Sequence, residues 1–308
     1  MVSAPTMAVD LGGIKMQNPV GTASGTFGFG WQFEGFYDVA QLGSITLKGC
    51  SPEPWEGNPS PRMCEVPSGV MNSVGLMNPG VAGLIDEDGE YLERLSRRGC
   101  AVICQAVGHS INEYVKAVDL FEERAPFAAG IEINISCPNI DEGGAAMGAT
   151  PEGAAKVVAA VRDHTTRPLL VKLAPARVPE VAHAVEDAGA DAISLINTIP
   201  AMSIDVNTRR SRVSRPTAGL SGPAIHAIAV RMVWEAASAT SLPINAMGGI
   251  TSGADAAEFI LAGATCVSVG TSNLVDPPSG PRILEELTDW VSSQGVESVS
   301  ELVGAFEC

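Results

Sequence analysis

The sequence predicts one α/β domain folded as a (β/α)8 TIM barrel, and three observations favour that fold. Short apolar, β-branched segments alternate with segments of helical period, and the alternation closes after eight repeats. The length of 308 residues suits one such barrel with inserted loops over its carboxyl-terminal face. No linker divides the chain, so residues 1–308 are expected to form a single domain. An open doubly wound sheet is the alternative arrangement.

The expected barrel strands are apolar, and each ends in small or polar residues. They cover residues 19–23, 44–49, 101–105, 131–136, 169–173, 191–196, 243–247 and 265–269. An N-terminal hairpin at residues 7–18, with a Gly12-Gly13 turn, is expected to close one end of the barrel.

Helices are expected between these strands. They cover residues 33–42, 89–98, 110–123, 151–165, 178–188, 221–239 and 253–262, with one or two more in the tail. Ser110, with Glu113 three residues later, resembles a capping box, and Thr150 followed by Pro151 is typical of a helix start.

Two segments interrupt the alternation of strands and helices. Residues 51–83 are rich in Pro, Gly and Asn, and we expect a long irregular loop that serves as a lid or binding loop. Residues 200–218 form a polar, Arg-rich insertion after the sixth strand.

Composition excludes several classes of function. The net charge of −16 argues against nucleic acid or an anionic membrane as a partner. No apolar run is long enough to span a membrane, and the N-terminus lacks the pattern of a secretory signal. The seven cysteines have no framework or metal-ligand spacing, so we expect reduced thiols, no metal site and a cytoplasmic location.

Candidate functional residues follow all eight expected strands, at the barrel end where active sites lie. They are Ser24, Lys48, Gln105, Asn134 with Cys137, Lys172, Asn197 with Thr198, Gly248-Gly249 and Gly270-Thr271. This even coverage predicts one large ligand site across the barrel mouth.

Glycines after the last two strands predict a phosphate site. Gly248-Gly249 and Gly270-Thr271 stand where such barrels often bind phosphate, and Gly222 at the start of a helix adds a donor. The ligand could be a phosphosugar or a flavin nucleotide; ordinary turns are the simpler interpretation of each glycine alone.

Lys172 and Cys137 each leave alternatives open. Lys172 ends an apolar strand and could be a Schiff-base nucleophile, a fixed charge beside an electron-rich ring, or a surface lysine. Cys137 follows the buried run that begins at Glu132 and could be a general base, a nucleophile, a ligand or a buried apolar residue.

Taken in order, a set of motifs resembles the dihydroorotate dehydrogenase family over about residues 7–290. The motifs are Ser24-Gly-Thr-Phe-Gly-Phe-Gly, Thr46-Leu-Lys48-Gly, Met71-Asn72-Ser-Val-Gly-Leu-Met-Asn78-Pro-Gly, Asn134-Ile-Ser-Cys137-Pro-Asn139, Val171-Lys172-Leu, Ile196-Asn197-Thr198, Gly219-Leu-Ser-Gly222-Pro-Ala, Met247-Gly248-Gly249-Ile and Val269-Gly270-Thr271. The cysteine at Cys137 and the glycine-rich segment after Ser24 resemble the NAD-linked class 1B catalytic subunits.

The resemblance implies FMN in the barrel mouth and dihydroorotate as the substrate. The implied FMN contacts are Ser24, Lys48, Gly49, Gln105 (where other members have asparagine), Asn134, Lys172, Ile196, Gly222, Gly248, Gly249, Gly270 and Thr271. The implied substrate contacts are Lys48, Asn72, Ser73, Val74, Gly75, Leu76, Asn134, Asn197 and Thr198, with Asn78 and Asn139 as further candidates. Cys137 would remove the C5 proton while the C6 hydride passes to flavin N5, and Lys172 would favour the reduced flavin.

The resemblance also implies a homodimer that pairs with a second subunit carrying FAD and a [2Fe–2S] cluster, which passes electrons to NAD. The chain itself has no dinucleotide fingerprint after a strand and no four-cysteine cluster motif. Three other hypotheses remain open: a phosphate-binding Schiff-base lyase that uses Lys172, a non-catalytic flavoprotein that relays electrons, and a related flavin-dependent pyrimidine reductase.

Overall fold

The computed structural model describes residues 4–136, 148 and 150–307, and within them eight parallel strands close into a barrel. The strands are β3 (Val20–Thr22), β4 (Ser44–Thr46), β7 (Ala101–Ala106), β8 (Gly130–Asn134), β9 (Leu169–Lys172), β10 (Ala192–Leu195), β15 (Ile244–Ala246) and β16 (Cys266–Val269). Each strand pairs with the next one along the chain, and β16 pairs with β3. The predicted fold class is confirmed.

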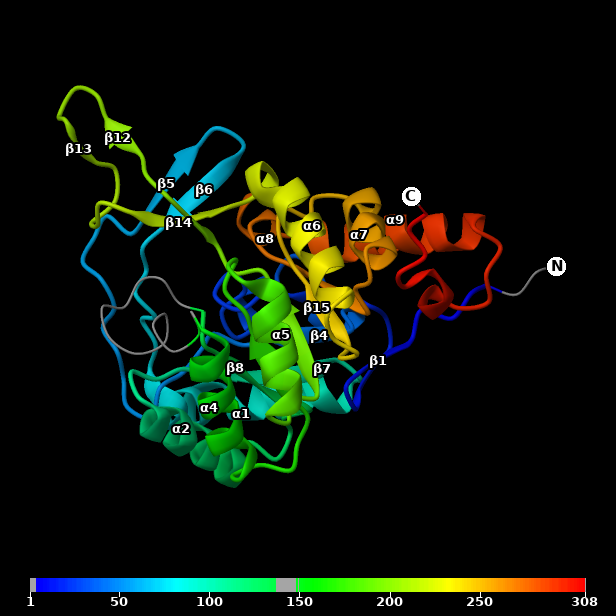
Figure 1. The fold of residues 1–308 in the computed structure, drawn as a ribbon, viewed down its shortest axis with the longest axis horizontal. Coiled ribbons are helices and arrows are strands. Elements are labelled where there is room, and N and C mark those ends of the chain that lie inside the picture. The colour runs from blue at the N-terminus through cyan, green and yellow to red at the C-terminus, as the bar shows by residue number, and fades with distance from the viewer. Residues whose placement is uncertain (1–3, 137–147, 149, 308) are drawn as a thin grey trace.

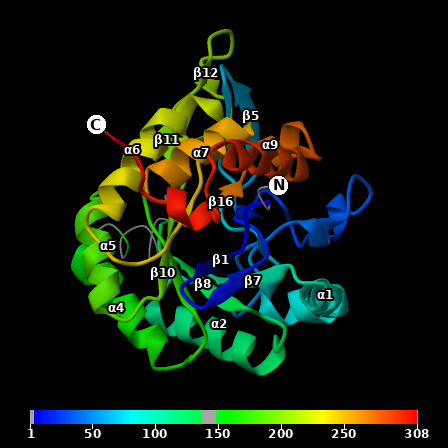
Figure 2. The ribbon, with the colours of Figure 1, turned by 90° about the vertical axis from the view of Figure 1, so that its right-hand side faces the viewer.

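Helices surround the barrel in chain order (Figure 2). They are α1 (Gly80–Arg97), α2 (Ile111–Arg124), α4 (Pro151–Arg162), α5 (Val178–Asp187), α6 (His226–Ala237), α7 (Gly253–Leu261), the short α8 (Ser272–Val275) and α9 (Ser279–Ser293). In the part of the chain that the structure describes there are also four short 3-10 helices: η1 (Trp31–Phe33), η2 (Val39–Gln41), η3 (Pro223–Ile225) and η4 (Val299–Leu302). The strands are buried on both faces, which explains why they are continuous apolar runs in the sequence. Within the described ranges, no helix has the length and apolar character needed to cross a bilayer.

The predicted hairpin and helix starts are present. Strands β1 (Val9–Leu11) and β2 (Ile14–Met16) pair antiparallel. The Thr150 side chain accepts from the Gly153 N–H at 3.1 Å, with Pro151 at the first helical position. Ser110 accepts from the Glu113 N–H, but the Glu113 carboxylate accepts from the His109 N–H at 2.8 Å, so the predicted capping box does not form.

The helix predicted at residues 33–42 is wrong. The chain makes the two separate turns η1 and η2 there, because Gly35 lies between them and because Asp38 begins a new turn by accepting from the Ala40 N–H at 3.1 Å. Phe33 stacks on Phe27 with ring centroids 4.0 Å apart, so aromatic packing takes the place of a regular helix.

The irregular loop predicted at residues 51–83 is also wrong in part. It contains a hairpin of β5 (Met63–Val66) and β6 (Gly69–Asn72), and α1 begins at Gly80, nine residues earlier than predicted. Val66 pairs with Gly69, so Pro67 and Ser68 form the two-residue turn of this hairpin, and Ser68 adopts a positive φ of 57° there.

The two interruptions of the barrel pattern form one small sheet. The insertion supplies β11 (Ile199–Ala201) and β14 (Ala218–Ser221), and the order β11-β14-β6-β5 joins them to the hairpin. Met71, Val213 and Ala218 pack together as its core. Strands β12 (Ile204–Asp205) and β13 (Arg210–Ser211) form a separate two-stranded sheet in the projection at the upper left of Figure 1.

Candidate active site

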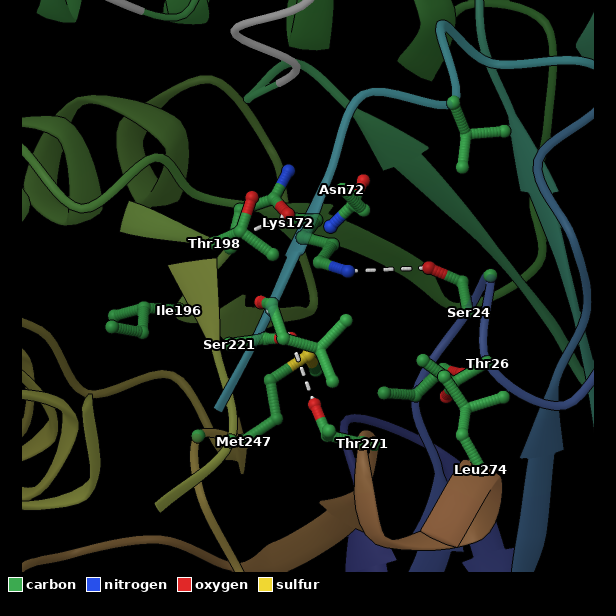
Figure 3. Close-up of a pocket in the computed structure, with 18 of the residues that line it drawn as sticks. Ser24, Thr26, Asn72, Lys172, Ile196, Thr198, Ser221, Met247, Thr271 and Leu274 are labelled. Carbon is green, nitrogen blue, oxygen red and sulfur yellow. Dashed lines mark hydrogen bonds between the residues drawn. The ribbon is translucent and has the colours of Figure 1, made fainter. Parts of the chain in front are cut away.

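A cavity lies at the carboxyl ends of the barrel strands, and residues at or just after the ends of all eight strands line it. Figure 3 shows part of this wall. The predicted site residues that line it are Ser24, Lys48, Asn72, Val74, Gly75, Leu76, Gln105, Asn134, Lys172, Ile196, Asn197, Thr198, Gly222, Gly248, Gly249, Gly270 and Thr271. Residues from distant parts of the sequence therefore meet at one place, as the strand-end pattern predicted.

Among the described residues, Gly49 and Ser73 were predicted as site residues but do not line this cavity. Gly49 lies behind Gln105, because a Cβ at Gly49 would stand 2.5 Å from the Gln105 Oε1. Ser73 is fully buried, and its hydroxyl accepts from Asn58 Nδ2 at 3.0 Å. Cys137 lies outside the residues that the structure describes, as does Asn139.

A buried polar cluster stands at the centre of the site. The Lys172 side chain, whose residue is 4% exposed, donates from Nζ to the Ser24 Oγ at 3.2 Å. Gln105 Nε2 donates to the same oxygen at 2.7 Å. Figure 3 shows Lys172 extending toward Ser24 across the cavity. Lys172 is therefore a charge inside the barrel mouth, and the interpretation as a surface lysine is excluded.

Asparagine amides form the wall beside this cluster. Asn134 Oδ1 accepts from the Ser136 hydroxyl at 2.9 Å, and the same hydroxyl accepts from Asn197 Nδ2 at 2.8 Å. The Thr198 N–H donates to Asn197 Oδ1 at 2.8 Å. These bonds orient both amides before any ligand binds.

Glycines form another part of the cavity wall. Gly222 has a φ of +95° and Gly249 a φ of +70°, and a Cβ at Gly249 would meet the Gly222 carbonyl oxygen at 2.8 Å. His226 Nδ1 lies 3.1 Å from the Gly248 carbonyl oxygen and supports the turn from behind. The Thr271 hydroxyl donates to Ser221 Oγ at 2.8 Å (Figure 3). Glycine suits both positions, because it adopts a positive φ without strain and has no Cβ to clash with the neighbouring backbone.

The loop after β6 lines the cavity, and hydrogen bonds from Asn78 hold its unusual backbone conformation. Gly75 and Leu76 both have positive φ, of 71° and 58°. Asn78 is 6% exposed and does not line the cavity; its Nδ2 donates to the Leu76 carbonyl at 2.8 Å and its Oδ1 accepts from the Ser51 and Gly80 N–H groups. A leucine in this conformation is uncommon and costs about 1–3 kcal/mol, so the Asn78 bonds hold it in place.

The cavity wall includes residues that the sequence did not single out. They are Ala23, Gly25, Thr26, Met63, Val70, Ser221, Ile225, Met247 and Leu274. Met63 and Val70 come from the hairpin that was predicted as an irregular loop. The Ser68-Gly69 dipeptide between two β-prone runs was the available signal for that hairpin.

Four described cysteines are buried away from the site. Burial raises the pKa of the Cys50 and Cys100 thiols to about 12, and it also raises the pKa of the Cys104 and Cys266 thiols. These thiols stay protonated near neutral pH and are not available to accept a proton, in agreement with a structural role. Across the described ranges, no group of three or more His, Cys, Asp or Glu side chains is arranged to hold a metal ion.

This architecture defines a TIM-barrel enzyme with a ligand site at the strand ends, where a glycine-lined turn and a buried lysine meet a set of amides. The sequence profile of the family described as dihydroorotate dehydrogenase matches residues 6–291. The chain belongs to the dihydroorotate dehydrogenase family of oxidoreductases.

Similar proteins agree with this assignment. The chain is 44% identical over 303 residues to a protein of Geotalea uraniireducens, covering 98% of each, and 45% identical over 305 residues to one of a Geobacter species, covering 98% of this chain and 99% of that protein. Both relatives are named dihydroorotate dehydrogenase B (NAD(+)), catalytic subunit. A dihydroorotate dehydrogenase from Eimeria tenella, crystallised with ferulenol, shares the fold with a TM-score of 0.80 at 23% identity, over 98% of this chain and 88% of that one.

Proposed function

We propose that this protein oxidises dihydroorotate to orotate in pyrimidine biosynthesis, with FMN bound in the barrel mouth. One observation carries the proposal beyond family membership: glycine turns, a set of oriented amides and the buried Lys172 all line one cavity. That arrangement suits a phosphorylated cofactor together with a planar, hydrogen-bonding ring.

The residues at the glycine end fit the phosphate of FMN. The cavity wall there consists of Gly222, Gly248, Gly249, Gly270 and Thr271. Backbone N–H groups at such turns bind phosphate without a basic side chain, and a Cβ at Gly249 would fill the space. Ser24, Lys48, Gln105, Asn134, Lys172 and Ile196 would contact the rest of the cofactor; Gly49 would act from behind Gln105. When bound, FMN supplies a two-electron acceptor.

The residues at the amide end fit dihydroorotate. Asn72, Asn134 and Asn197 line the cavity, and amide groups can both donate to and accept from an imide-like ring edge. Lys48 and Thr198 lie in the same wall, where a cation and a hydroxyl can bind the substrate carboxylate. Residues 74–76 would cover the ring, and Ser73 would hold that loop in position.

Cys137 is proposed as the base that takes the C5 proton. It follows Ser136 directly, and Ser136 is held at the cavity by Asn134 and by Asn197, whose Nδ2 donates to the Ser136 carbonyl at 3.3 Å and hydroxyl at 2.8 Å. The ordinary pKa of a cysteine thiol lies only a unit or two above neutral pH, which suits a general base.

The test uses the purified full chain. We expect a yellow protein whose flavin absorbance bleaches with dihydroorotate under anaerobic conditions. Cys137→Ala should lower the rate of that bleaching by about 10²–10⁴-fold, the range for loss of a general base, while FMN stays bound. A colourless protein would contradict the proposal, and a yellow protein that dihydroorotate does not bleach would instead favour a non-catalytic flavoprotein. An unchanged bleaching rate in Cys137→Ala would exclude Cys137 as the base.

A Schiff-base lyase is a second candidate, because such enzymes need an amine that is shielded from water. Lys172 meets that requirement, with 4% exposure. Borohydride with a carbonyl substrate would then leave a covalent mass adduct on Lys172. We expect no adduct, because the proposed reaction uses Lys172 as a fixed charge beside the cofactor.

The relatives' names describe a catalytic subunit of an NAD-linked enzyme. We propose the same for this chain: a cytoplasmic homodimer that assembles with a second subunit carrying FAD and a [2Fe–2S] cluster. The electrons taken from dihydroorotate would leave through that subunit to NAD.

A further inference from the structure

A carboxylate lies inside the barrel, below the floor of the cavity. Glu132 on β8 is fully buried. Its Oε1 accepts from Gln105 Nε2 at 2.5 Å, and its Oε2 accepts from the Ser194 hydroxyl. Ser194 belongs to β10, which β9 separates from β8, so this second contact crosses the barrel interior. Burying a charged group is expensive, and a group kept in such a place calls for a physical explanation.

The carboxylate determines which way the Gln105 amide faces. Gln105 Nε2 has two hydrogens, and it donates to Glu132 and to Ser24 Oγ. A carboxylate accepts hydrogen bonds and donates none, so rotating the amide by half a turn would set the Gln105 carbonyl against Glu132. The Gln105 carbonyl therefore faces Asn134 Nδ2, at 3.4 Å.

The orientation continues along the cavity wall. Since Asn134 Nδ2 faces Gln105, Asn134 Oδ1 faces Ser136 and accepts from its N–H at 3.2 Å and its hydroxyl at 2.9 Å. The Ser136 hydroxyl in turn accepts from Asn197 Nδ2 at 2.8 Å. Donors and acceptors thus alternate without conflict from Glu132 to Asn197.

The same amide also orients Ser24. Ser24 Oγ accepts from both Gln105 Nε2 and Lys172 Nζ. Two donors on one hydroxyl oxygen leave its own hydrogen to point elsewhere, and Ser24 lines the cavity. The hydroxyl is therefore a donor toward a ligand, and a reversed Gln105 amide would turn it into an acceptor from the cavity side.

We propose that Glu132 is a positioning residue, which acts through Gln105 to orient the Ser24 hydroxyl and the Asn134 amide toward the cofactor and substrate. The inference rests on the proposed function, because it assigns that role within the same site. Glu132 itself would contact neither ligand. Its effect is on the geometry of the reacting groups, where a displacement of about 1 Å can cost about 10²-fold in rate.

Two substitutions at Glu132 separate hydrogen bonding from charge. Glu132→Gln retains an acceptor for Gln105 and can donate to Ser194, so it preserves the orientation and removes only the charge. Glu132→Met has nearly the same shape and removes both acceptors. We expect Glu132→Gln to keep the wild-type flavin spectrum and kcat. Glu132→Met should alter the visible flavin band and lower kcat for dihydroorotate by tenfold or more, with a smaller change in KM, measured with a dye as electron acceptor.

Gln105→Met breaks the same link from the other side and leaves the Glu132–Ser194 contact intact. It should change the flavin band and kcat at least as much as Glu132→Met, and the double variant should lose no more than Gln105→Met alone, since Glu132 acts through Gln105. If Glu132→Met does not fold, the contrast between Glu132→Gln and Gln105→Met still tests the inference.

Ser268→Ala is the matched control for loss of a buried bond inside the barrel. Ser268 on β16 donates to Asn245 Oδ1 at 2.9 Å, and neither residue is hydrogen-bonded to Glu132 or Gln105. This variant should lower the melting temperature by an amount similar to Glu132→Met but leave the flavin band unchanged.

The outcomes are distinct. A wild-type flavin band and kcat in Glu132→Met or in Gln105→Met would overturn the inference. So would a Glu132→Gln variant as impaired as Glu132→Met, because charge rather than orientation would then matter. Either result leaves the proposed function standing, provided that the wild-type protein oxidises dihydroorotate. A wild-type protein that binds no FMN would overturn both.

Discussion

Single residues decide the glycine end of the cavity. Gly249 combines a positive φ with two close neighbours, the Gly222 carbonyl oxygen at 2.8 Å and the His226 Cβ at 2.9 Å from an added Cβ. A side chain at Gly249 would both strain the backbone, because φ is positive, and collide with these two neighbours. The second matters for function, because it pushes the two glycine turns apart.

The first prediction concerns Gly249→Ala. We expect an FMN dissociation constant at least tenfold higher than that of wild type, since the phosphate loses its cradle. A loss of about 1–3 kcal/mol in the free energy of unfolding should accompany it. Fluorescence titration of the apoprotein with FMN and urea unfolding measure the two effects.

Gly295→Ala is the control, because Gly295 has a φ of +73° and an added Cβ there would meet no atom within 4 Å. It should lower the free energy of unfolding by about 1–2 kcal/mol, because of its backbone conformation alone, and leave FMN binding as in wild type. An equal loss of FMN affinity in both variants would show that general destabilisation, not the cradle, is responsible.

At the scale of elements, the helices that follow the last two barrel strands are joined by one carboxylate. Glu286 on α9 accepts from the N–H of Gly253, the first residue of α7, at 2.6 Å, and from Arg282 at 3.0 Å. The Gly253 N–H, followed by Arg282, holds the pKa of Glu286 below its ordinary value of 4.5. An anion at a helix N-terminus is stabilised by the unpaired N–H groups there.

A pH dependence follows for Glu286→Gln. Because the folded-state pKa of Glu286 is lowered, its contribution to stability is complete above the unfolded-state pKa and disappears as pH falls through the folded-state value. The variant should therefore melt at a lower temperature than wild type at pH 7, and the difference should shrink progressively below about pH 4.5. Thermal unfolding between pH 3 and 7 measures it.

Glu285→Gln provides the comparison, because Glu285 is the exposed neighbour on the same helix. It removes the same charge without touching α7, and its melting temperature should stay near wild type at every pH. A Glu286→Gln difference that does not change with pH would contradict the assignment.

At the scale of the whole molecule, the two segments that interrupt the alternation of strands and helices both lie at the active-site end of the barrel. The small sheet β11-β14-β6-β5 draws Met63, Val70 and Asn72 into the cavity wall from one insertion and Ser221 from the other. The chain has no dinucleotide fingerprint of its own, so the proposed NAD-linked reaction requires a second protein.

The purified chain alone should therefore transfer electrons from dihydroorotate to a redox dye but form no NADH from NAD. We expect NADH, measured by its absorbance, only after the proposed FAD and [2Fe–2S] subunit is added. NADH formation by the isolated chain would contradict this division of labour.

Much of the fold could be predicted because its signals are local. Each barrel strand is an apolar run, and Thr150 with Pro151 marks its helix in the sequence itself. The helix predicted at residues 33–42 failed because aromatic packing between Phe27 and Phe33 overrides a weak local preference. Most of the predicted site residues meet in the cavity, because the ends of parallel strands share one edge whatever joins them.

The sequence by itself thus determined the barrel and the strand-end residues, since both depend on periodicity along the chain. Only the tertiary structure decided that two interruptions pair into one sheet, that Asn78 holds a loop, and that Glu132 faces Gln105 and Ser194. The physical reason is the range of the interactions. Apolar periodicity is set by near neighbours, whereas a buried hydrogen bond depends on which distant strand brings its donor within 3 Å or so.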